Sequence, residues 1–299
     1  MTYDFIIVGG SFAGHAAALQ LARARKRILL IDAGRPRNRF AHASHGFLGQ
    51  DGQKPSKIIS GAASQLAAYP TVEQREGEVT DAEISGSGFR LSLANGRAES
   101  TRRLILATGV RDVLPSLPGL KERWGSSVLH CPYCHGYELD NKPVGVLGES
   151  AIALHQATLV PDWGPTTLFT QGTLQLDTEQ MAMLQRRNVN VEREPIVELL
   201  GNGTDLEAVR LADGRVVALA GLYIAPKTEQ ASDLAADLGC AFEDGMTGPV
   251  IRVDDRQQTS VPGIFAAGDA AHPMANATLA AAAGVMAATG AHQSLIHGT

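Results

Sequence analysis

The chain has 299 residues, 44% of them hydrophobic and 19% charged, with a formal net charge of −5. This length and composition allow one large core or two medium ones, and the acidic balance argues against a nucleic acid or an anionic membrane as a partner. The first residues carry no basic leader before their apolar run, so we expect a cytoplasmic protein. The most apolar late stretch, Thr278 to Ala291, is shorter than the roughly 20 residues that span a bilayer.

The N-terminal segment has the pattern of a nucleotide-binding strand–helix–strand unit. Tyr3 to Gly14 reads as a buried strand running into a tight turn, His15 to Ala24 as a helix, and Arg27 to Ile31 as a second strand that ends at an acid. Glycines permit the turn, the helix N-terminus faces a pyrophosphate, and the acid takes a ribose hydroxyl. A serine replaces the middle glycine of the fingerprint. A glycine loop alone is also weak evidence, so an ordinary strand–turn–helix is the alternative. The candidate cofactor-binding residues here are Gly9, Gly10, Ser11, Ala13, Gly14 and Asp32.

Two later strands lead into further candidate cofactor-binding turns. The strand Leu104 to Leu106 enters the turn formed by Ala107, Thr108 and Gly109. Near the C-terminus, Val261 to Ala267 brings Gly268 and Asp269 to the end of the sheet, where ligands of open α/β folds bind. A helix beginning around Asn276 to Thr278 would direct its positive end there, which suits an electron-rich flavin.

The run Cys131-Pro132-Tyr133-Cys134 contains the residues that carry redox chemistry. Two cysteines at this spacing can close and reopen a disulfide, which is a two-electron reaction. Proline is favoured at the first position of a helix, which places Cys131 near the cap and favours its thiolate. His135 follows directly and can exchange a proton with the thiols. We predict Cys131, Cys134 and His135 as catalytic residues.

Other interpretations of this motif remain open. A structural zinc site needs four ligands, and Cys240 is the one cysteine left, which we interpret as a small core residue. Cys-x-x-Cys-His is also the attachment pattern of c-type haem, and two inert buried cysteines can have this spacing. The turns that suit a flavin argue against these interpretations of the cysteines. We predict no metal site.

A second, weaker nucleotide-binding pattern follows the cysteines. Pro143 to Ala153 gives strand, turn and helix, with Gly148, Ser150 and Ala153 at the fingerprint positions. The next strand ends at Gln171-Gly172, where a nicotinamide 2′-phosphate requires arginine. NAD(P)H is therefore a doubtful cofactor, and a Rossmann-like domain without a tight nucleotide site is the alternative.

Several basic residues outside these motifs receive plainer interpretations. The arginines that follow Asp32 are interpreted as a solvated loop, with contact to the cofactor as the alternative. The histidines of the glycine-rich connection are interpreted as surface residues, with a place near the flavin as the alternative. His272 is the better candidate for lining a site. These loop residues are Arg35, Arg37, Arg39, His42 and His45.

In their order along the chain, these motifs resemble the low-molecular-weight thioredoxin reductase family over nearly the whole length. The resemblance implies an α/β fold of two Rossmann-like three-layer domains, the second inserted in the first. The FAD domain would comprise residues 1–115 and 240–299, and the insert, residues 116–239, would carry the cysteines. It also implies a homodimer and a rotation between domains, with Cys134 nearest the flavin and Cys131 meeting the substrate.

Two departures from that family point to a subgroup. His135 stands where those reductases have aspartate, and Phe169 to Gly172 stands where they have a basic segment. The Cys-x-x-Cys-His-Gly form resembles the dithiol oxidases that close disulfides in gliotoxin-type metabolites, with O2 as electron acceptor. We predict an FAD-dependent thiol–disulfide oxidoreductase that oxidises dithiols, with NAD(P)H-dependent thioredoxin reduction as the alternative. The substrate would be a dithiol or disulfide, on a small molecule or a thioredoxin-like protein. A redox-responsive binding module is a third class.

Overall fold

The computed structural model describes residues 2–148 and 150–298, so Glu149, in the second predicted turn, lies outside the described residues. The chain forms two compact units. Unit 1 contains Met1–Arg39, Pro55–Asp112 and Thr228–Thr299, and unit 2 contains Phe40–Lys54 and Val113–Lys227.

The division between the units differs from the predicted boundaries in specific segments. Residues 40–54 and 113–115 group with the second unit, and residues 228–239 group with the first. In the first of these segments, His42 bonds Ser126 of unit 2. In the last, Leu234 is buried in the core of unit 1. Neither contact follows from local sequence pattern.

Unit 1 is built on a mainly parallel sheet of order β3-β2-β1-β6-β5-β4, with β19 also paired to β6. The central strands are buried on both faces, which is why they read as continuous apolar runs. β4 and β5 form an antiparallel hairpin beside β6. The strands are β1 (Thr2–Val8), β2 (Ile28–Asp32), β3 (Val72–Glu76), β4 (Val79–Ser85), β5 (Gly88–Leu93), β6 (Ala98–Leu106) and β19 (Ile264–Ala266).

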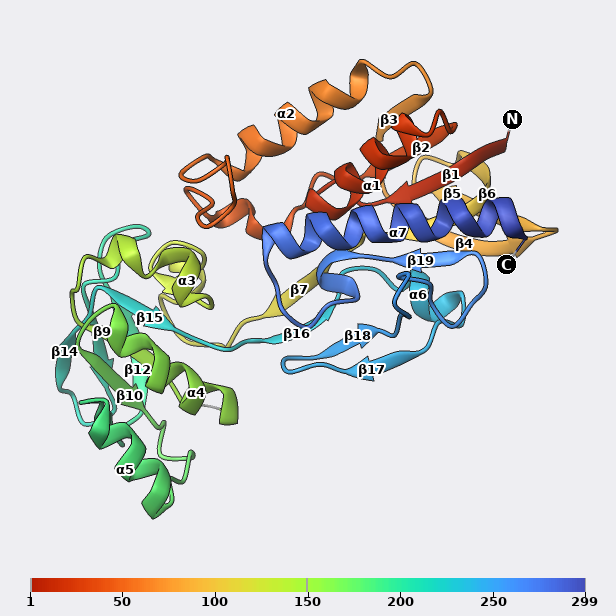
Figure 1. Cartoon of the computed structure of the whole chain (residues 1–299). Helices are drawn as coiled ribbons and strands as arrows, with labels where there is room; N and C mark the ends of the chain where they lie inside the picture. The colour runs from red at the N-terminus through yellow and green to blue at the C-terminus, as the bar shows by residue number, and fades with distance from the viewer. Residues whose placement is uncertain (1, 149, 299) are drawn as a thin grey trace. The chain divides into compact units, whose positions relative to one another are not determined.

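Helices and a small hairpin cover the two faces of this sheet. α1 (Phe12–Arg23) and α7 (Ala277–His297) run side by side over one face, and α2 (Pro55–Ala67) buries Leu66 in the same core (Figure 1). On the other face, α6 (Leu234–Asp237) packs with the hairpin of β17 (Phe242–Asp244) and β18 (Pro249–Ile251). Short 3-10 turns, η1 (Arg37–Phe40) and η5 (Gly268–Ala270), also belong to this unit, apart from Phe40.

The length of α7 corrects the estimate made from Thr278 to Ala291. The helix has 21 residues and, by length and composition alone, is long and apolar enough to cross a membrane. However, Ala283, Gly284, Ala287 and Ala288 are buried in the core shared with α1. Packing within unit 1 therefore explains the apolar residues on one face of the helix.

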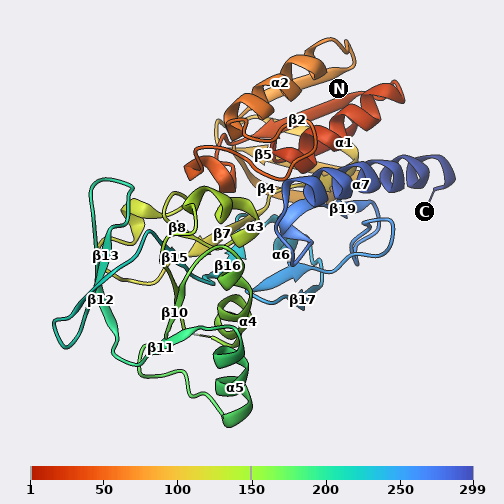
Figure 2. The same cartoon turned by 60° about the vertical axis from the view of Figure 1, so that its left-hand side comes forward.

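Unit 2 is a second, smaller Rossmann-like unit (Figure 2). Its parallel sheet has the order β11-β10-β9-β15-β8. α4 and α5 share one core with this sheet, and the antiparallel sheet β12-β13-β14 shares another. The elements are β8 (Val128–Leu129), β9 (Val144–Leu147), α4 (Ala151–Leu159), β10 (Thr166–Phe169), α5 (Thr178–Arg186), β11 (Asn190–Glu192), β12 (Ile196–Leu200), β13 (Ala208–Leu211), β14 (Val216–Ala218) and β15 (Gly221–Tyr223), with 3-10 turns η2 (Lys121–Arg123) and η4 (Val160–Asp162). The predicted fold class is confirmed.

The chain passes between the units along two strands that pair with each other, β7 (Val110–Val113) and β16 (Lys227–Gln230). Arg111 Nη2 and Glu229 Oε2 form an exposed ion pair, 2.7 Å long, between these strands. An exposed pair of this kind contributes little to stability, about 0–1 kcal/mol.

The packing of α7 on α1 predicts a strong effect of one added methyl group. In Gly284→Ala, the new Cβ would lie 2.1 Å from the main-chain oxygen of Ala13. Overpacking of this kind costs ~1–3 kcal/mol, which exceeds the gain of roughly 1 kcal/mol from better helix propensity. We expect urea denaturation to show a clear loss of stability.

The matched control is Gly61→Ala in α2, where no atom lies within 4 Å of the new Cβ. This variant should be neutral or slightly stabilised, by up to about 1 kcal/mol. Equal stability of the two variants would contradict the close contact between α1 and α7.

Candidate active site

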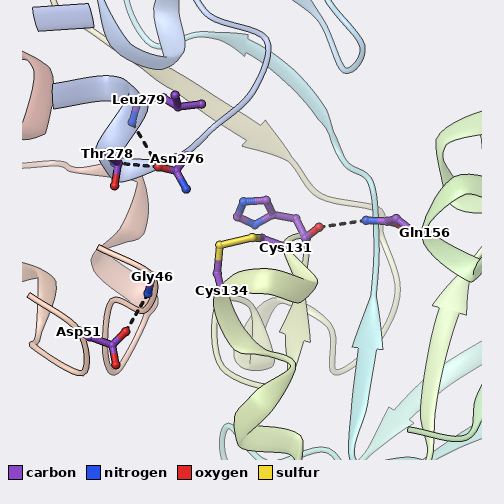
Figure 3. The surroundings of a disulfide bond; sticks show 9 residues. Gly46, Asp51, Cys131, Cys134, Gln156, Asn276, Thr278 and Leu279 are labelled. Atoms are coloured by element: carbon purple, nitrogen blue, oxygen red, sulfur yellow. Dashed lines mark hydrogen bonds between the residues drawn. A yellow bond between two sulfur atoms is a disulfide. The ribbon is translucent and has the colours of Figure 1, made fainter. Parts of the chain in front are cut away.

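The two predicted redox cysteines are joined in a disulfide. Cys131 and Cys134 are bonded, with their Cα atoms 5.3 Å apart (Figure 3). Cys131 is the N-cap of α3 (Pro132–His135), and Pro132 takes the first helical position, as predicted. α3 is a single turn, followed by η3 (Tyr137–Leu139), so its dipole is small.

Neighbouring elements of unit 2 hold the cysteine segment in place. The side-chain amide of Gln156, in α4, donates to the main-chain oxygen of His130 at 3.0 Å (Figure 3). On the other side, Tyr133 and Trp163 stack edge to face with ring centroids 5.2 Å apart. Both cysteines are half-buried, and Tyr133 between them is 72% exposed. A disulfide held this way keeps its position while remaining accessible.

His135 has the environment of a proton acceptor. Burial lowers its pKa below the ordinary value for histidine, the charge of Glu138 raises it, and His45 lowers it again, so the net shift is downward. The imidazole is therefore neutral near pH 7, which is the form that takes a proton from a thiol.

A polar cavity of about 470 Å³ lies within unit 2 beside this segment. Nε2 of His45 lies 3.4 Å from Oε1 of Glu138, and Nε2 of His42 lies 3.1 Å from the hydroxyl of Ser126. The lining residues are His42, Ala43, His45, Gly125, Ser126, Ser127, His135, Glu138, Leu139, Lys142, Asp205, Leu206 and Ala220.

The sequence analysis interpreted His45 as a surface residue, with a place near the flavin as the alternative, and did not name Glu138 as a member of this site. His42 is exposed, as expected for a surface histidine, but the His45 side chain is only 23% exposed and lies beside the carboxylate of Glu138. Glu138 could have been noticed, because it lies three residues after His135 in a helical stretch, where side chains share a face.

The turn after β1 has the form of a dinucleotide cradle. Gly9 has φ +106°, and a Cβ there would lie 2.1 Å from the oxygen of Ala107. A Cβ on Gly14 would lie 1.8 Å from the oxygen of Gly9, so the helix rests directly on the turn. The N-cap Ser11 makes no side-chain capping bond, which leaves the first-turn N–H groups open to an anion. The backbone N–H of Gly10 donates to Oδ1 of Asp32 at 3.0 Å.

The other predicted cofactor-binding residues gather around the same strands of unit 1. Ala107 follows β6 and receives the close approach of Gly9, with Thr108 and Gly109 next along the chain. Gly268 follows β19 and has φ +73°, and a Cβ there would lie 3.0 Å from Cβ of Ala13. The structure therefore brings all three predicted turns to the carboxyl edge of one sheet.

Arg37 is tied to Asp269, which corrects its interpretation as a solvated loop residue. Its Nη1 lies 2.9 Å from Oδ2 of Asp269, and its Nη2 lies 2.5 Å from Oδ1 of Asp112, at the end of β7. Burial disfavours the charged guanidinium, but the two carboxylates outweigh it and raise the pKa of Arg37. By contrast, Arg35 is exposed, as expected, and pairs with Glu78.

α7 begins where predicted, and its N-terminus is already capped. The side-chain oxygen of Asn276 accepts from the backbone N–H of Thr278 at 2.8 Å and of Leu279 at 3.2 Å (Figure 3). His272, which precedes this helix, is exposed.

The second nucleotide-type turn lacks a cation at the predicted position. Gln171 follows β10, and its side-chain oxygen accepts from the backbone N–H of Ile196 at 2.8 Å. Arg193, after the neighbouring strand β11, lies next to Gly172: a Cβ on that glycine would be 3.8 Å from its main-chain oxygen. Sequence reasoning overlooked Arg193 because it considered one strand end alone.

Cys240 is buried, as predicted for a core residue, and burial raises the pKa of its thiol. Within residues 2–148 and 150–298, no group of three or more histidine, cysteine, aspartate or glutamate side chains could hold a metal ion.

A family model for pyridine nucleotide-disulphide oxidoreductases matches residues 3–293. The chain belongs to this family. A solved oxidoreductase from Agrobacterium tumefaciens is 51% identical, with a TM-score of 0.96, and the match covers 100% of both chains. The thioredoxin reductase tcpT of Claviceps purpurea is 34% identical, over 89% of this chain and 86% of its own. The thioredoxin reductase sirT of Leptosphaeria maculans is 29% identical, over 96% and 93%.

The resemblance identified from motifs is thereby confirmed. The protein is a thioredoxin reductase-like disulfide oxidoreductase of the class II flavoprotein family. Family membership implies a flavin, usually with NAD(P)H. The turn after β1 fits a flavin dinucleotide, because its glycines let α1 pack directly against the turn and the first-turn N–H groups of α1 carry no side-chain cap.

The electrostatics of the site predict an effect of Glu138 on His135. Glu138→Gln removes a negative charge that stabilises the imidazolium, so the pKa of His135 should fall further below its ordinary value. An NMR titration of the His135 ring protons measures this shift. Glu179→Gln, on α5, is the control and should leave the pKa unchanged. A raised or unaltered pKa in Glu138→Gln would show that this carboxylate does not act on His135.

Proposed function

We propose that this protein is an FAD-dependent dithiol oxidase, which turns two substrate thiols into a disulfide and delivers the electrons to O2. The observation that carries this direction is the end of β10, where Gln171 binds the main chain of Ile196 through both side-chain ends. A nicotinamide 2′-phosphate requires a cation there. Because no cation stands at the end of β10, this site favours a thiol over a nicotinamide nucleotide as the electron donor.

The cysteines would perform the exchange in two displacements. A substrate thiolate attacks Sγ of Cys131, the S–S bond breaks, and Cys134 leaves as a thiolate. The second substrate thiolate then attacks the first substrate sulfur, which releases the substrate disulfide and the Cys131 thiolate. The substrate has lost two electrons and the cysteine pair has gained them.

His135 would take the proton from the attacking thiol, because its imidazole is neutral and directly follows Cys134. The thiolate is the reactive species in exchange, so a base at this place accelerates the first displacement.

The flavin would be held by Gly9, Gly10, Ser11, Ala13, Gly14 and Asp32, together with Ala107, Thr108, Gly109, Gly268 and Asp269. Bound FAD supplies a two-electron acceptor that reoxidises the cysteine pair and reduces O2 to hydrogen peroxide.

NAD(P)H-dependent reduction of a disulfide, on a small molecule or a thioredoxin-like protein, is the second candidate function. It is favoured by Arg193, which stands beside Gly172 and could supply a cation from the neighbouring strand. It is also favoured by relatives that are named thioredoxin reductases.

A homodimer in the cytoplasm is part of this proposal. The outer face of α7 supports self-association, because four of its apolar side chains are exposed and none of its other exposed residues from Thr278 to Ile296 is acidic, lysine or arginine. These apolar residues are Leu279, Val285, Met286 and Ile296.

Anaerobic titration of the flavin-loaded protein distinguishes the two directions. We expect the visible flavin band to persist with NADPH and NADH, to bleach promptly with a dithiol, and to return in air. Rapid bleaching by either nucleotide would instead support the reductase.

Cys134→Ser should abolish bleaching of the flavin by dithiols, because the thiol that passes electrons on is absent. Stopped-flow absorbance under argon measures this rate. Cys240→Ala is the control and should react like the wild type, since that thiol is buried outside the site. Full dithiol turnover in Cys134→Ser would exclude the proposed electron route.

A further inference from the structure

We propose that His45, paired with Glu138, carries protons between His135 and the solvent through the cavity of unit 2. This proposal rests on the proposed function, because it assigns His135 the task of deprotonating a substrate thiol. Nothing in the cysteine motif itself points to His45, which lies in a different segment of the chain.

Three proton-carrying side chains line the same cavity. His45, His135 and Glu138 all face it, and Nε2 of His45 lies 3.4 Å from Oε1 of Glu138. Glu138 lies three residues after His135 within a helical stretch, so both side chains lie on one face. The cavity, about 470 Å³ in volume, has room for water between them.

A hydrogen bond within the loop that carries His45 helps to hold its imidazole ring beside the carboxylate of Glu138. The backbone N–H of Gly46 donates to Oδ1 of Asp51 at 2.8 Å, which closes the loop (Figure 3). The same carboxylate oxygen lies 3.7 Å from Nδ1 of His45. The ring thus has a carboxylate oxygen within 3.7 Å of one nitrogen and another within 3.4 Å of the other.

A relay is needed because His135 is a poor place to store a proton. Burial lowers its pKa, so an imidazolium left there costs free energy. In each displacement one substrate S–H loses its proton as its sulfur forms an S–S bond. Two protons leave per substrate, and two are taken up when O2 becomes hydrogen peroxide. His45, partly exposed and flanked by carboxylates, can pass these protons to water.

Other titratable groups also lie near the relay. His42, Lys142 and Asp205 line the cavity, and the charge of Glu138 also acts on Tyr223, whose pKa is raised chiefly by burial. His42 is bonded to Ser126, so it stands apart from the pair formed by His45 and Glu138. This makes His42 a matched control in the same segment and the same cavity.

The experiment measures disulfide reduction by dithiothreitol in the flavin-loaded protein under argon. Thiols are trapped by alkylation at timed intervals and counted by mass, and the flavin band is recorded in parallel. The rates are measured for wild type, His45→Ala and His42→Ala across the pH range in which imidazole titrates, with and without added imidazole.

For His45→Ala we expect the rate of disulfide reduction to fall about tenfold, a modest part of what general acid–base catalysis contributes. Added imidazole should enter the vacated space and restore the rate. His42→Ala should retain the wild-type rate and show no response to imidazole.

Three results would overturn the relay: a His45→Ala rate within about twofold of the wild type, an equal fall in both variants, or a fall that imidazole does not relieve. The last two would assign His45 to holding the segment in place. Failure of the proposed function is a separate result: the wild-type disulfide would be reduced by dithiothreitol while the flavin band stayed unchanged.

Discussion

Direct backbone contact at one point of unit 1 is the constraint on which the nucleotide-binding half of this protein depends. The turn after β1, the end of β6 and the helices α1 and α7 meet there with no side chain between them. A Cβ on Gly9, Gly14 or Gly284 would lie between 1.8 and 2.1 Å from a main-chain oxygen. Close packing of this kind brings the uncapped N–H groups of α1 to the carboxyl edge of the sheet, where parallel folds bind their ligands.

Unit 2 contains a similar parallel sheet. Its turn after β9 leads into α4, yet the residue after the next strand, Gln171, is bonded to the main chain. α4 also supports the cysteine segment, through the bond from Gln156 to His130. The second Rossmann-like unit therefore holds the redox disulfide in place.

The groups around the disulfide differ in how far they are exposed to solvent. The cysteines are half-buried, while His135 is desolvated enough to remain a base. Beside it lies a polar cavity with partly exposed titratable groups. In the proposed mechanism, His135 would remove protons without storing charge, because passing each proton to the partly exposed groups avoids the cost of a buried cation.

By itself the sequence determined those features of the protein that depend on residues close together in the chain. Apolar runs of strand length, the glycines between Gly9 and Gly14, and two cysteines beside Pro132 each impose a local geometry, so the fold class and the family followed from them. Only the tertiary structure decided the grouping of residues 40–54 with the second unit, the ion pairs of Arg37 with Asp112 and Asp269, and the pairing of His45 with Glu138. These contacts join segments far apart in the chain. Whether a charged side chain is paired or solvated depends on which segments folding brings together, and no local periodicity records it.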